Sequence, residues 1–244
     1  MLIGLRPLIE AVESGKEIDK VLMQQGLKGE LINEARDVLR RYAIPYKTVP
    51  LEKLNSISRK NHQGIIAFVS PLSFGNIENI VAEIYERGET PNLILLDGVT
   101  DVRNFGAICR SAECMGVQAV IIPENGSAQV NEEAIKTSAG ALYNLPLCRV
   151  KSLSRTIEFL QQSGISVTCC SEKARKPLDQ VNLTTPSCIV MGNEETGISS
   201  EIMRKTDNLA LIPMKGKTAS LNVSVAAGII LYEIMRQRSA DSAS

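Results

Sequence analysis

The sequence has 244 residues, a net charge of zero at neutral pH and 44% hydrophobic residues. This length allows one large or two small domains with packed cores. No apolar run approaches the roughly 18 residues that a membrane-spanning helix needs, and the first residues lack the apolar core of a signal peptide. We therefore expect a cytoplasmic protein. Any contact with nucleic acid must come from local basic patches, because the chain has no overall positive field.

The cysteine and histidine content argues against a metal site. There are six cysteines and one histidine, and no two cysteines form a Cys-x-x-Cys pair. Structural zinc sites and disulfide frameworks need such closely spaced ligands. The sequence therefore predicts no metal and six free thiols buried in apolar segments.

Residues 1–71 read as a small α/β unit. Apolar spacing predicts helices within 4–12, 28–42 and 51–57, and strands over 18–23, 45–49 and 64–69. The last strand is apolar throughout, which is typical of a central strand. A polar segment, 58–64, precedes it. Its spacing alone leaves two interpretations open, an RNA-contacting loop and a solvated turn.

Residues 72–91 contain prolines and glycines around one short helix, predicted over 77–87. Prolines and glycines in this arrangement are typical of loops and linkers. We therefore expect an interdomain linker here, with its charges facing solvent.

Residues 92–244 alternate between strands and helices. Strands are predicted over 92–97, 119–122, 145–147, 165–168, 187–191 and 208–212, and helices over 104–115, 131–138, 153–161 and 221–237. Such alternation predicts a parallel sheet covered by helices on both faces.

Two loops in the last third of the chain follow apolar strands and precede helices. The first, 192–199, contains Gly192, Glu194 and Gly197, and Ser199 is placed to cap the next helix. The second, 212–222, contains a Ser-Leu-Asn sequence at 220–222, with Ser220 placed as another cap. Ligands of open α/β sheets bind at the carboxyl ends of strands, so the two loops are expected to wall one pocket.

Neither loop fits a known phosphate-binding pattern. The spacing of Gly192 and Gly197 suits a P-loop, but Ile198 replaces its lysine. Lys217-Thr218 fits the end of that motif, but Leu211 stands where its first glycine belongs. No Gly-x-Gly-x-x-Gly follows a strand either. An acidic first loop without lysine suits a cationic or neutral ligand bound largely through backbone groups.

Three segments together resemble the motifs of one enzyme family. Asn104-Phe105-Gly106-Ala107-Ile108-Cys109-Arg110-Ser111-Ala112 is similar to motif 1 of the SpoU (TrmH) RNA ribose 2'-O-methyltransferases. Gly192-Asn193-Glu194 with Gly197 is similar to motif 2, and Ile212-Pro213 with Ser220-Leu221-Asn222 to motif 3. The order of the motifs also matches. Two departures occur: Val102-Arg103 lacks the usual proline of motif 1, and Glu195-Thr196 replaces a Gly-x pair in motif 2.

The resemblance implies a fold and a domain organisation. Residues 92–244 would form an α/β methyltransferase domain of the SPOUT superfamily with a deep trefoil knot. Segments at 4–11 and 62–67 resemble the two ends of an L30e/L7Ae-like substrate-binding domain, which would occupy 1–71 and bind RNA. Residues 72–91 would be the linker.

The resemblance also implies a reaction and its residues. The enzyme would transfer a methyl group from S-adenosylmethionine to a ribose 2'-hydroxyl. The catalytic residues would be Asn104, Arg110, Glu194, Ser220 and Asn222. The cofactor-binding residues would be Met191, Gly192, Asn193, Gly197, Ile212, Met214, Ser220 and Leu221. The RNA-binding residues would be Arg6, Arg59, Lys60 and His62.

The family implies a homodimer through the last helix, with no membrane partner. Ribosomal RNA is the expected substrate, because shorter relatives that act on tRNA often lack the N-terminal domain. Within the family, the chain is most like the subgroup that methylates the ribose of guanosine in 23S rRNA. Three alternatives remain: a tRNA methyltransferase, a non-catalytic RNA-binding protein on the same fold, and an unrelated nucleotide-binding enzyme.

Overall fold

The computed structural model describes residues 1–218 and 220–241, and the chain divides into two units at Ser73 and Phe74. We call Met1–Ser73 the N-terminal unit and Phe74–Ser244 the C-terminal unit, and each is described by itself. Within the described residues, no helix is long and apolar enough to cross a membrane.

The N-terminal unit is a mixed four-stranded sheet with three helices. Its elements are β1 (Leu2–Ile3), α1 (Leu5–Glu13), β2 (Ile18–Gln24), α2 (Glu30–Arg41), β3 (Tyr46–Val49), α3 (Leu51–Ile57) and β4 (Ile65–Val69). The strand order is β1-β4-β2-β3, with β2 and β3 parallel and the other pairs antiparallel. The apolar strand β4 is interior to the sheet, which confirms its predicted position. The two-residue strand β1 was not predicted.

The two faces of this sheet have separate cores. Amphipathic helices α1 and α2 bury Leu8, Ala35 and Leu39 against one face. Helix α3 buries Leu54 against Leu22 and Ile66 on the other. Because side chains alternate along a strand, β2 and β4 supply apolar residues to both cores.

The C-terminal unit is a seven-stranded parallel sheet. Its helices are α4 (Ile77–Glu86), α5 (Val102–Cys114), α6 (Glu132–Thr137), α7 (Leu153–Gln162), α8 (Ser200–Lys205) and α9 (Val223–Asp241). Its strands are β5 (Asn92–Asp97), β6 (Ala119–Pro123), β7 (Leu147–Val150), β8 (Ser166–Cys170), β9 (Lys176–Pro177), β10 (Ser187–Gly192) and β11 (Asn208–Leu211). The order is β7-β6-β5-β10-β8-β11-β9, and every paired strand is parallel to its neighbour. The predicted parallel sheet with alternating helices is confirmed; β9 was not predicted.

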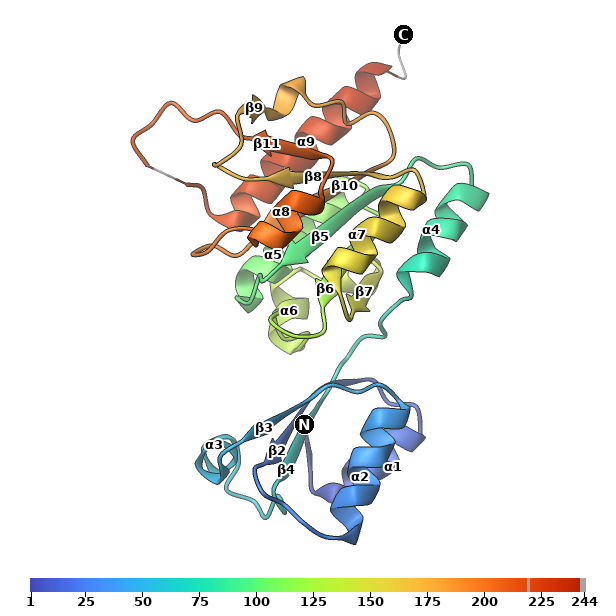
Figure 1. The fold of residues 1–244 in the computed structure, drawn as a ribbon, viewed down its shortest axis with the longest axis vertical. Coiled ribbons are helices and arrows are strands. Elements are labelled where there is room, and N and C mark those ends of the chain that lie inside the picture. The colour runs from blue at the N-terminus through green and yellow to red at the C-terminus, as the bar shows by residue number, and fades with distance from the viewer. Residues whose placement is uncertain (219, 242–244) are drawn as a thin grey trace. The chain divides into compact units, whose positions relative to one another are not determined.

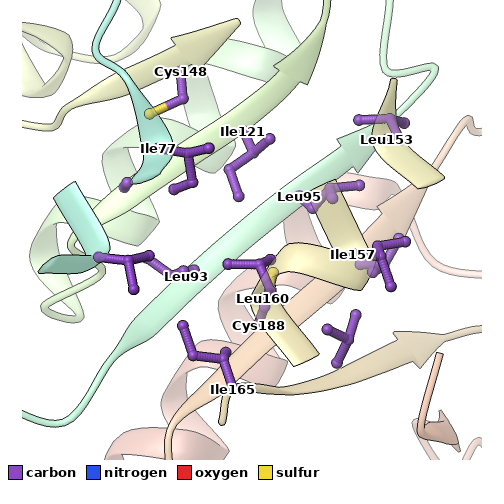
Figure 2. Packing of buried hydrophobic residues seen from close by; sticks show 14 of the residues in the cluster. Ile77, Leu93, Leu95, Ile121, Cys148, Leu153, Ile157, Leu160, Ile165 and Cys188 are labelled. Carbon is purple, nitrogen blue, oxygen red and sulfur yellow. The ribbon is translucent and has the colours of Figure 1, made fainter. Parts of the chain in front are cut away.

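Helices cover both faces of the parallel sheet (Figure 1). On one face α4, α7 and α8 bury Ile84, Leu160 and Ile202 against the strands. Figure 2 shows Ile157 and Leu160 of α7 lying over Leu93 and Leu95 of β5. On the other face α5 and α9 pack against each other, and Gly228 of α9 faces Ser111 of α5.

The boundary between the units differs from the predicted one. The segment expected to be a linker includes α4, whose residues Ile77, Val81 and Ile84 are buried in the core of the C-terminal unit. Their spacing of four and three residues is that of an amphipathic helix face. The prolines and glycines at the ends of the segment favoured a linker, although the helix between them has the apolar spacing of a core element. The C-terminal unit therefore begins before α4 and not at β5.

Arg238 fixes the far end of α9 to the amino ends of the strands. Its guanidinium donates hydrogen bonds to the carbonyls of Leu183 and Pro91 and to the hydroxyl of Ser187, among others. Burial lowers the pKa of Arg238 from its ordinary value. A buried guanidinium is stable only when its donors are satisfied, so this clamp defines where α9 lies. The first turn of α9 is thereby held at the carboxyl ends of the strands.

Candidate active site

The loop after β10 (residues 192–199, the motif 2 loop) folds back on itself. The Asn193 and Gly197 backbones exchange hydrogen bonds of 3.1 and 2.9 Å. This return brings the backbone of Gly197 and Ile198 against Gly192, where a Cβ atom would lie under 3.0 Å from their atoms. Gly192 is therefore required by the loop itself, in addition to any contact with a ligand. Gly197 has a φ of 72°, which a glycine adopts without strain.

The side chain of Asn193 holds this loop to the neighbouring strand. Its amide donates to the Gly98 carbonyl after β5 at 2.8 Å, and its oxygen accepts from the Glu195 and Thr196 amides at 2.8 and 3.1 Å. Sequence analysis placed Asn193 in the cofactor site, whereas these bonds show a side chain that shapes the pocket wall. The residue still lines the pocket.

Asp97, at the end of β5, fixes the start of α8. Its carboxylate accepts from the Ser199 backbone amide at 2.8 Å. The predicted capping by the Ser199 side chain is wrong: Ser199 occupies the N-cap position without a side-chain hydrogen bond. Asp97 supplies the capping oxygen from 102 residues away in the sequence, which local patterns do not reveal.

Asn222 brings the three motifs together. Its side-chain amide donates to Asn104 Oδ1 of motif 1 at 3.1 Å and to Glu194 Oε1 of motif 2 at 2.7 Å. The side-chain oxygen Oδ1 of Asn222 accepts from the backbone amide of Ser224 at 3.0 Å and from the backbone amide of Val225 at 3.4 Å. Asn222 therefore caps the start of α9. The predicted cap, Ser220, is wrong, because α9 begins at Val223.

A pocket of about 340 Å³ lies at the carboxyl ends of β8, β10 and β11. This is the edge where ligands of open α/β sheets bind, and the volume lies in the range of small-molecule sites. All eight residues expected to bind a cofactor line it: Met191, Gly192, Asn193, Gly197, Ile212, Met214, Ser220 and Leu221. Ala219 lies outside the described residues.

One wall of this pocket was not predicted from the sequence. Cys170, the last residue of β8, and residues 171–173 after it line the pocket. The Ser171 amide donates to the Ala210 carbonyl of β11 at 2.9 Å, which fixes the turn. A signal was available, because 170–173 begins two residues after the end of the strand predicted over 165–168 of a parallel sheet. It carries no glycine or motif residue and therefore did not stand out.

The expected catalytic residues fall into two groups. Asn104, Glu194 and Asn222 are joined by hydrogen bonds, and Ser220 lines the pocket beside them. Arg110 is exposed on α5 and does not line the pocket within this chain. Gly106 of motif 1 has a packing role, because a Cβ there would lie under 3.0 Å from Thr137 on α6.

The expected RNA-binding residues also divide. Arg6, Arg59 and Lys60 are exposed, and the Leu5 amide donates to Gln63 Oε1 at 3.3 Å, so the start of α1 meets the 58–64 loop. His62 is only 6% exposed, and its two ring nitrogens lie 2.9 Å from Asn55 Oδ1 and 3.1 Å from the Gly64 amide. The structure therefore gives the His62 ring a role in shaping this loop and not in surface contact.

The thiols and the acidic groups form no metal site within the described residues. Burial raises the pKa of Cys169 to about 11 and that of Cys148 to about 12. Such thiols are poor nucleophiles and ligands at neutral pH. The expectation that all six are buried is wrong for Cys114, which is exposed at the end of α5, and for Cys170, which is partly exposed at the end of β8.

Comparisons with known proteins agree with the motifs. The profile of the SpoU rRNA Methylase family matches residues 91–232, and that of RNA 2'-O ribose methyltransferase substrate binding matches residues 1–75. A protein of Staphylococcus saprophyticus assigned to the TrmH family of tRNA/rRNA methyltransferases is 33% identical over 98% of this chain and 96% of its own length.

Two solved structures are also similar. The SpoU methyltransferase AviRb from Streptomyces viridochromogenes, in complex with the cofactor AdoMet, is 26% identical with a TM-score of 0.63, covering 98% of this chain and 90% of its own. The TrmH/SpoU tRNA modifying enzyme of A. aeolicus is 30% identical with a TM-score of 0.58, covering 68% of this chain and 86% of its own. The chain therefore belongs to the SpoU rRNA methylase family and is an RNA methyltransferase.

Proposed function

We propose that the chain acts in the cytoplasm as a homodimer that methylates a ribose 2'-hydroxyl of ribosomal RNA with S-adenosylmethionine. The observation that carries this proposal is the Asn222 amide, which joins Asn104 of motif 1 to Glu194 of motif 2 beside the pocket. Three segments separated by 28 and 118 residues meet there. Such convergence of polar groups next to a concave site is the usual mark of an active site.

The pocket suits S-adenosylmethionine. Its walls offer apolar side chains for a purine and backbone amides and carbonyls of the motif 2 loop for polar groups. The charged lining residues are Glu172, Lys173, Glu194 and Glu195, so acidic groups outnumber the single lysine. A sulfonium is a cation, and carboxylates nearby favour it. When bound, the cofactor supplies an electrophilic methyl group.

The remaining task of the chain is to orient the hydroxyl and manage its proton. An arginine side chain keeps its proton in proteins, so a guanidinium is a poor base for the ribose hydroxyl. Orienting an RNA phosphate and stabilising the developing alkoxide are easier tasks for an arginine. We assign these to Arg110, and to Asn104, Glu194, Ser220 and Asn222 the positioning of the ribose.

The homodimer is proposed from α9. One side of this helix is buried on its own sheet through Ala227, Ile230, Leu231 and Ile234. A second apolar stripe is exposed: Val225 (51%), Ile229 (40%), Tyr232 (54%) and Met235 (39%). Contiguous exposed apolar residues on a soluble helix mark an interface. A partner copy there would also bring its exposed Arg110 toward a pocket whose described lining contains no arginine.

The choice of ribosomal RNA rests on the N-terminal unit. Its profile match is to a substrate-binding domain, and Arg6, Arg59 and Lys60 are exposed around one loop. The tRNA modifying enzyme of A. aeolicus covers only 68% of this chain, whereas AviRb covers 98%. An enzyme that modifies tRNA therefore does not generally require the N-terminal unit. We propose that this unit binds ribosomal RNA.

The test is methyl transfer from labelled S-adenosylmethionine to unmodified 23S ribosomal RNA and, separately, to a tRNA pool. We expect label in the ribosomal RNA, as a 2'-O-methyl group that resists alkaline cleavage. Label in tRNA alone would replace the substrate proposal. No label in either, with titration showing no binding of S-adenosylhomocysteine, would favour a non-catalytic RNA-binding protein.

Arg110→Ala tests the mechanism. We expect kcat to fall by roughly 10³-fold, because the variant loses a cation that stabilises transition-state charge. Sedimentation and S-adenosylhomocysteine titration are expected to match the wild type. Arg103→Ala, on the same helix and paired with Glu133 at 3.4 Å, is the control and retains activity. Normal turnover of Arg110→Ala would remove the arginine from the mechanism.

A further inference from the structure

The two loops that wall the pocket carry opposite charges. The motif 2 loop, residues 192–199, contains Glu194 and Glu195 and no basic residue. Residues 212–218, which we call the motif 3 loop, contain Lys215 and Lys217 and no acidic residue. Figure 1 shows this second segment as a long loop between β11 and α9, without regular structure.

Lys215 and Lys217 have no structural role within the described residues. Both are exposed, and neither makes a hydrogen bond or ion pair with another described residue. Lys215 directly follows Met214, and Lys217 lies three positions before Ser220, and both of these neighbours line the pocket. The two lysines therefore lie close in the sequence to residues at the pocket mouth, and they have no partner in the described chain.

The methyl donor does not explain these lysines. The pocket lining has more acidic than basic side chains, and a sulfonium gains nothing from additional cations. A P-loop that binds a nucleotide phosphate is also excluded, because Leu211 stands where that motif requires its first glycine before Gly216-Lys217-Thr218. The remaining anion that must reach this mouth is the RNA backbone, since each ribose is flanked by two phosphates.

We propose that Lys215 and Lys217 bind phosphates of the RNA strand on either side of the methylated ribose. The strand then crosses the pocket mouth over the motif 3 loop and away from Glu194 and Glu195. Phosphate contacts of this kind set the register of a nucleic acid without reading its sequence. This inference rests on the proposed function, and it names the groups that hold the substrate at that site.

The first test is the double charge reversal Lys215→Glu/Lys217→Glu. With 23S ribosomal RNA transcript as substrate, we expect KM for RNA to rise at least tenfold at about 0.15 M salt, where local charges are only partly screened. Affinity for S-adenosylhomocysteine and the melting temperature are expected to remain unchanged. The matched control is Lys136→Glu/Lys151→Glu, two exposed lysines of the same unit that do not line the pocket. It changes net charge equally and should alter KM less than twofold.

The second test counts the phosphates. The neutral variant Lys215→Gln/Lys217→Gln is titrated with a labelled 20-nucleotide single-stranded RNA of mixed sequence over a range of salt concentrations. Each lost contact reduces the magnitude of the negative slope of log K against log salt by about 0.7 for a single strand. We therefore expect the magnitude of the slope to fall by about 1.4.

Three results would overturn the inference: an unchanged KM in the double reversal, an equal effect in the control pair, or loss of S-adenosylhomocysteine binding in either variant. The last would assign the lysines to the cofactor pocket. Failure of the proposed function is a separate result, because wild-type protein would then transfer no methyl group. The salt slope with single-stranded RNA still tests the lysines in that case.

Discussion

The two loops that face each other across the pocket are built in different ways. The motif 2 loop is held by a backbone return at Asn193 and Gly197, by the Asn193 side chain and by close packing at Gly192. In the motif 3 loop, residues 214–218 are exposed and have no hydrogen bonds within the described chain. One wall is therefore preorganised by its own contacts, and the other is much less constrained.

This difference separates two tasks of a transfer enzyme. A preorganised wall lowers the free energy lost when a cofactor is ordered in its bound shape. A less constrained wall, with two cations, can adjust to a polymeric substrate whose phosphates vary in position. Substitutions in the first loop are therefore expected to affect stability and cofactor affinity, and substitutions of the two lysines in the second loop are expected to affect RNA binding.

The largest expected effect comes from Gly192→Ala. The added Cβ would lie under 3.0 Å from backbone atoms of Gly197 and Ile198, which no rotamer change can relieve. We expect a destabilisation of about 3 kcal/mol and S-adenosylhomocysteine affinity reduced by at least about 100-fold, since each 1.4 kcal/mol is tenfold. Thermal unfolding and calorimetric titration measure both quantities.

Gly216→Ala is the matched control in the other loop. A Cβ at Gly216 would meet no atom within 4 Å, and its φ is not in the left-handed region. Its stability should therefore stay within about 0.5 kcal/mol of the wild type. Equal effects at Gly192 and Gly216 would contradict the contrast between the loops.

Asn193→Ala is expected to have the next largest effect. The substitution removes one donor and one acceptor, which leaves the Gly98 carbonyl and the amides of Glu195 and Thr196 without partners. We expect a loss of about 2 kcal/mol and weaker cofactor binding with kcat less affected. Asn144→Ala, at an exposed asparagine, is the control and should be neutral. A stable Asn193→Ala variant with normal affinity would show that the backbone return suffices.

The fold was largely predictable because burial leaves periodic patterns. Helix α3 and strand β5 occupy the predicted ranges, 51–57 and 92–97. The short strands β1 and β9 have two residues each, too few to show a period. Helix α4 had a clear apolar face, but the surrounding glycines and prolines favoured a linker.

The site was predictable as a set of residues but not as a set of contacts. Resemblance grouped Asn104, Glu194 and Asn222, yet the bond between Asn222 and Asn104 spans 118 residues. Local patterns also favoured Ser220 as the cap of α9, because serine is a common cap. Asn222 is the cap instead, because its side chain accepts from the first turn of α9 and also donates to Asn104 and Glu194.

The smallest effect concerns Asn222, the one described side chain that joins the fixed loop to the start of α9. Asn222→Asp keeps an oxygen for the cap, but it places a second carboxylate where the Asn222 amide now donates to Glu194 at 2.7 Å. Two carboxylates at this distance repel when both are ionised and can share a proton in acid. The variant should therefore lose about 1 kcal/mol relative to the wild type at pH 7 and less at pH 4, because protonation relieves the repulsion.

Asn222→Ser separates the cap from the link. Serine retains an acceptor for the first turn of α9 but is too short to hold both Asn104 and Glu194. Its stability relative to the wild type should not depend on pH between 4 and 7, while kcat should fall because the link to Asn104 and Glu194 is lost. A pH-dependent loss in both variants would place the titrating group elsewhere, and full activity in Asn222→Ser would show that the cap alone aligns the two walls.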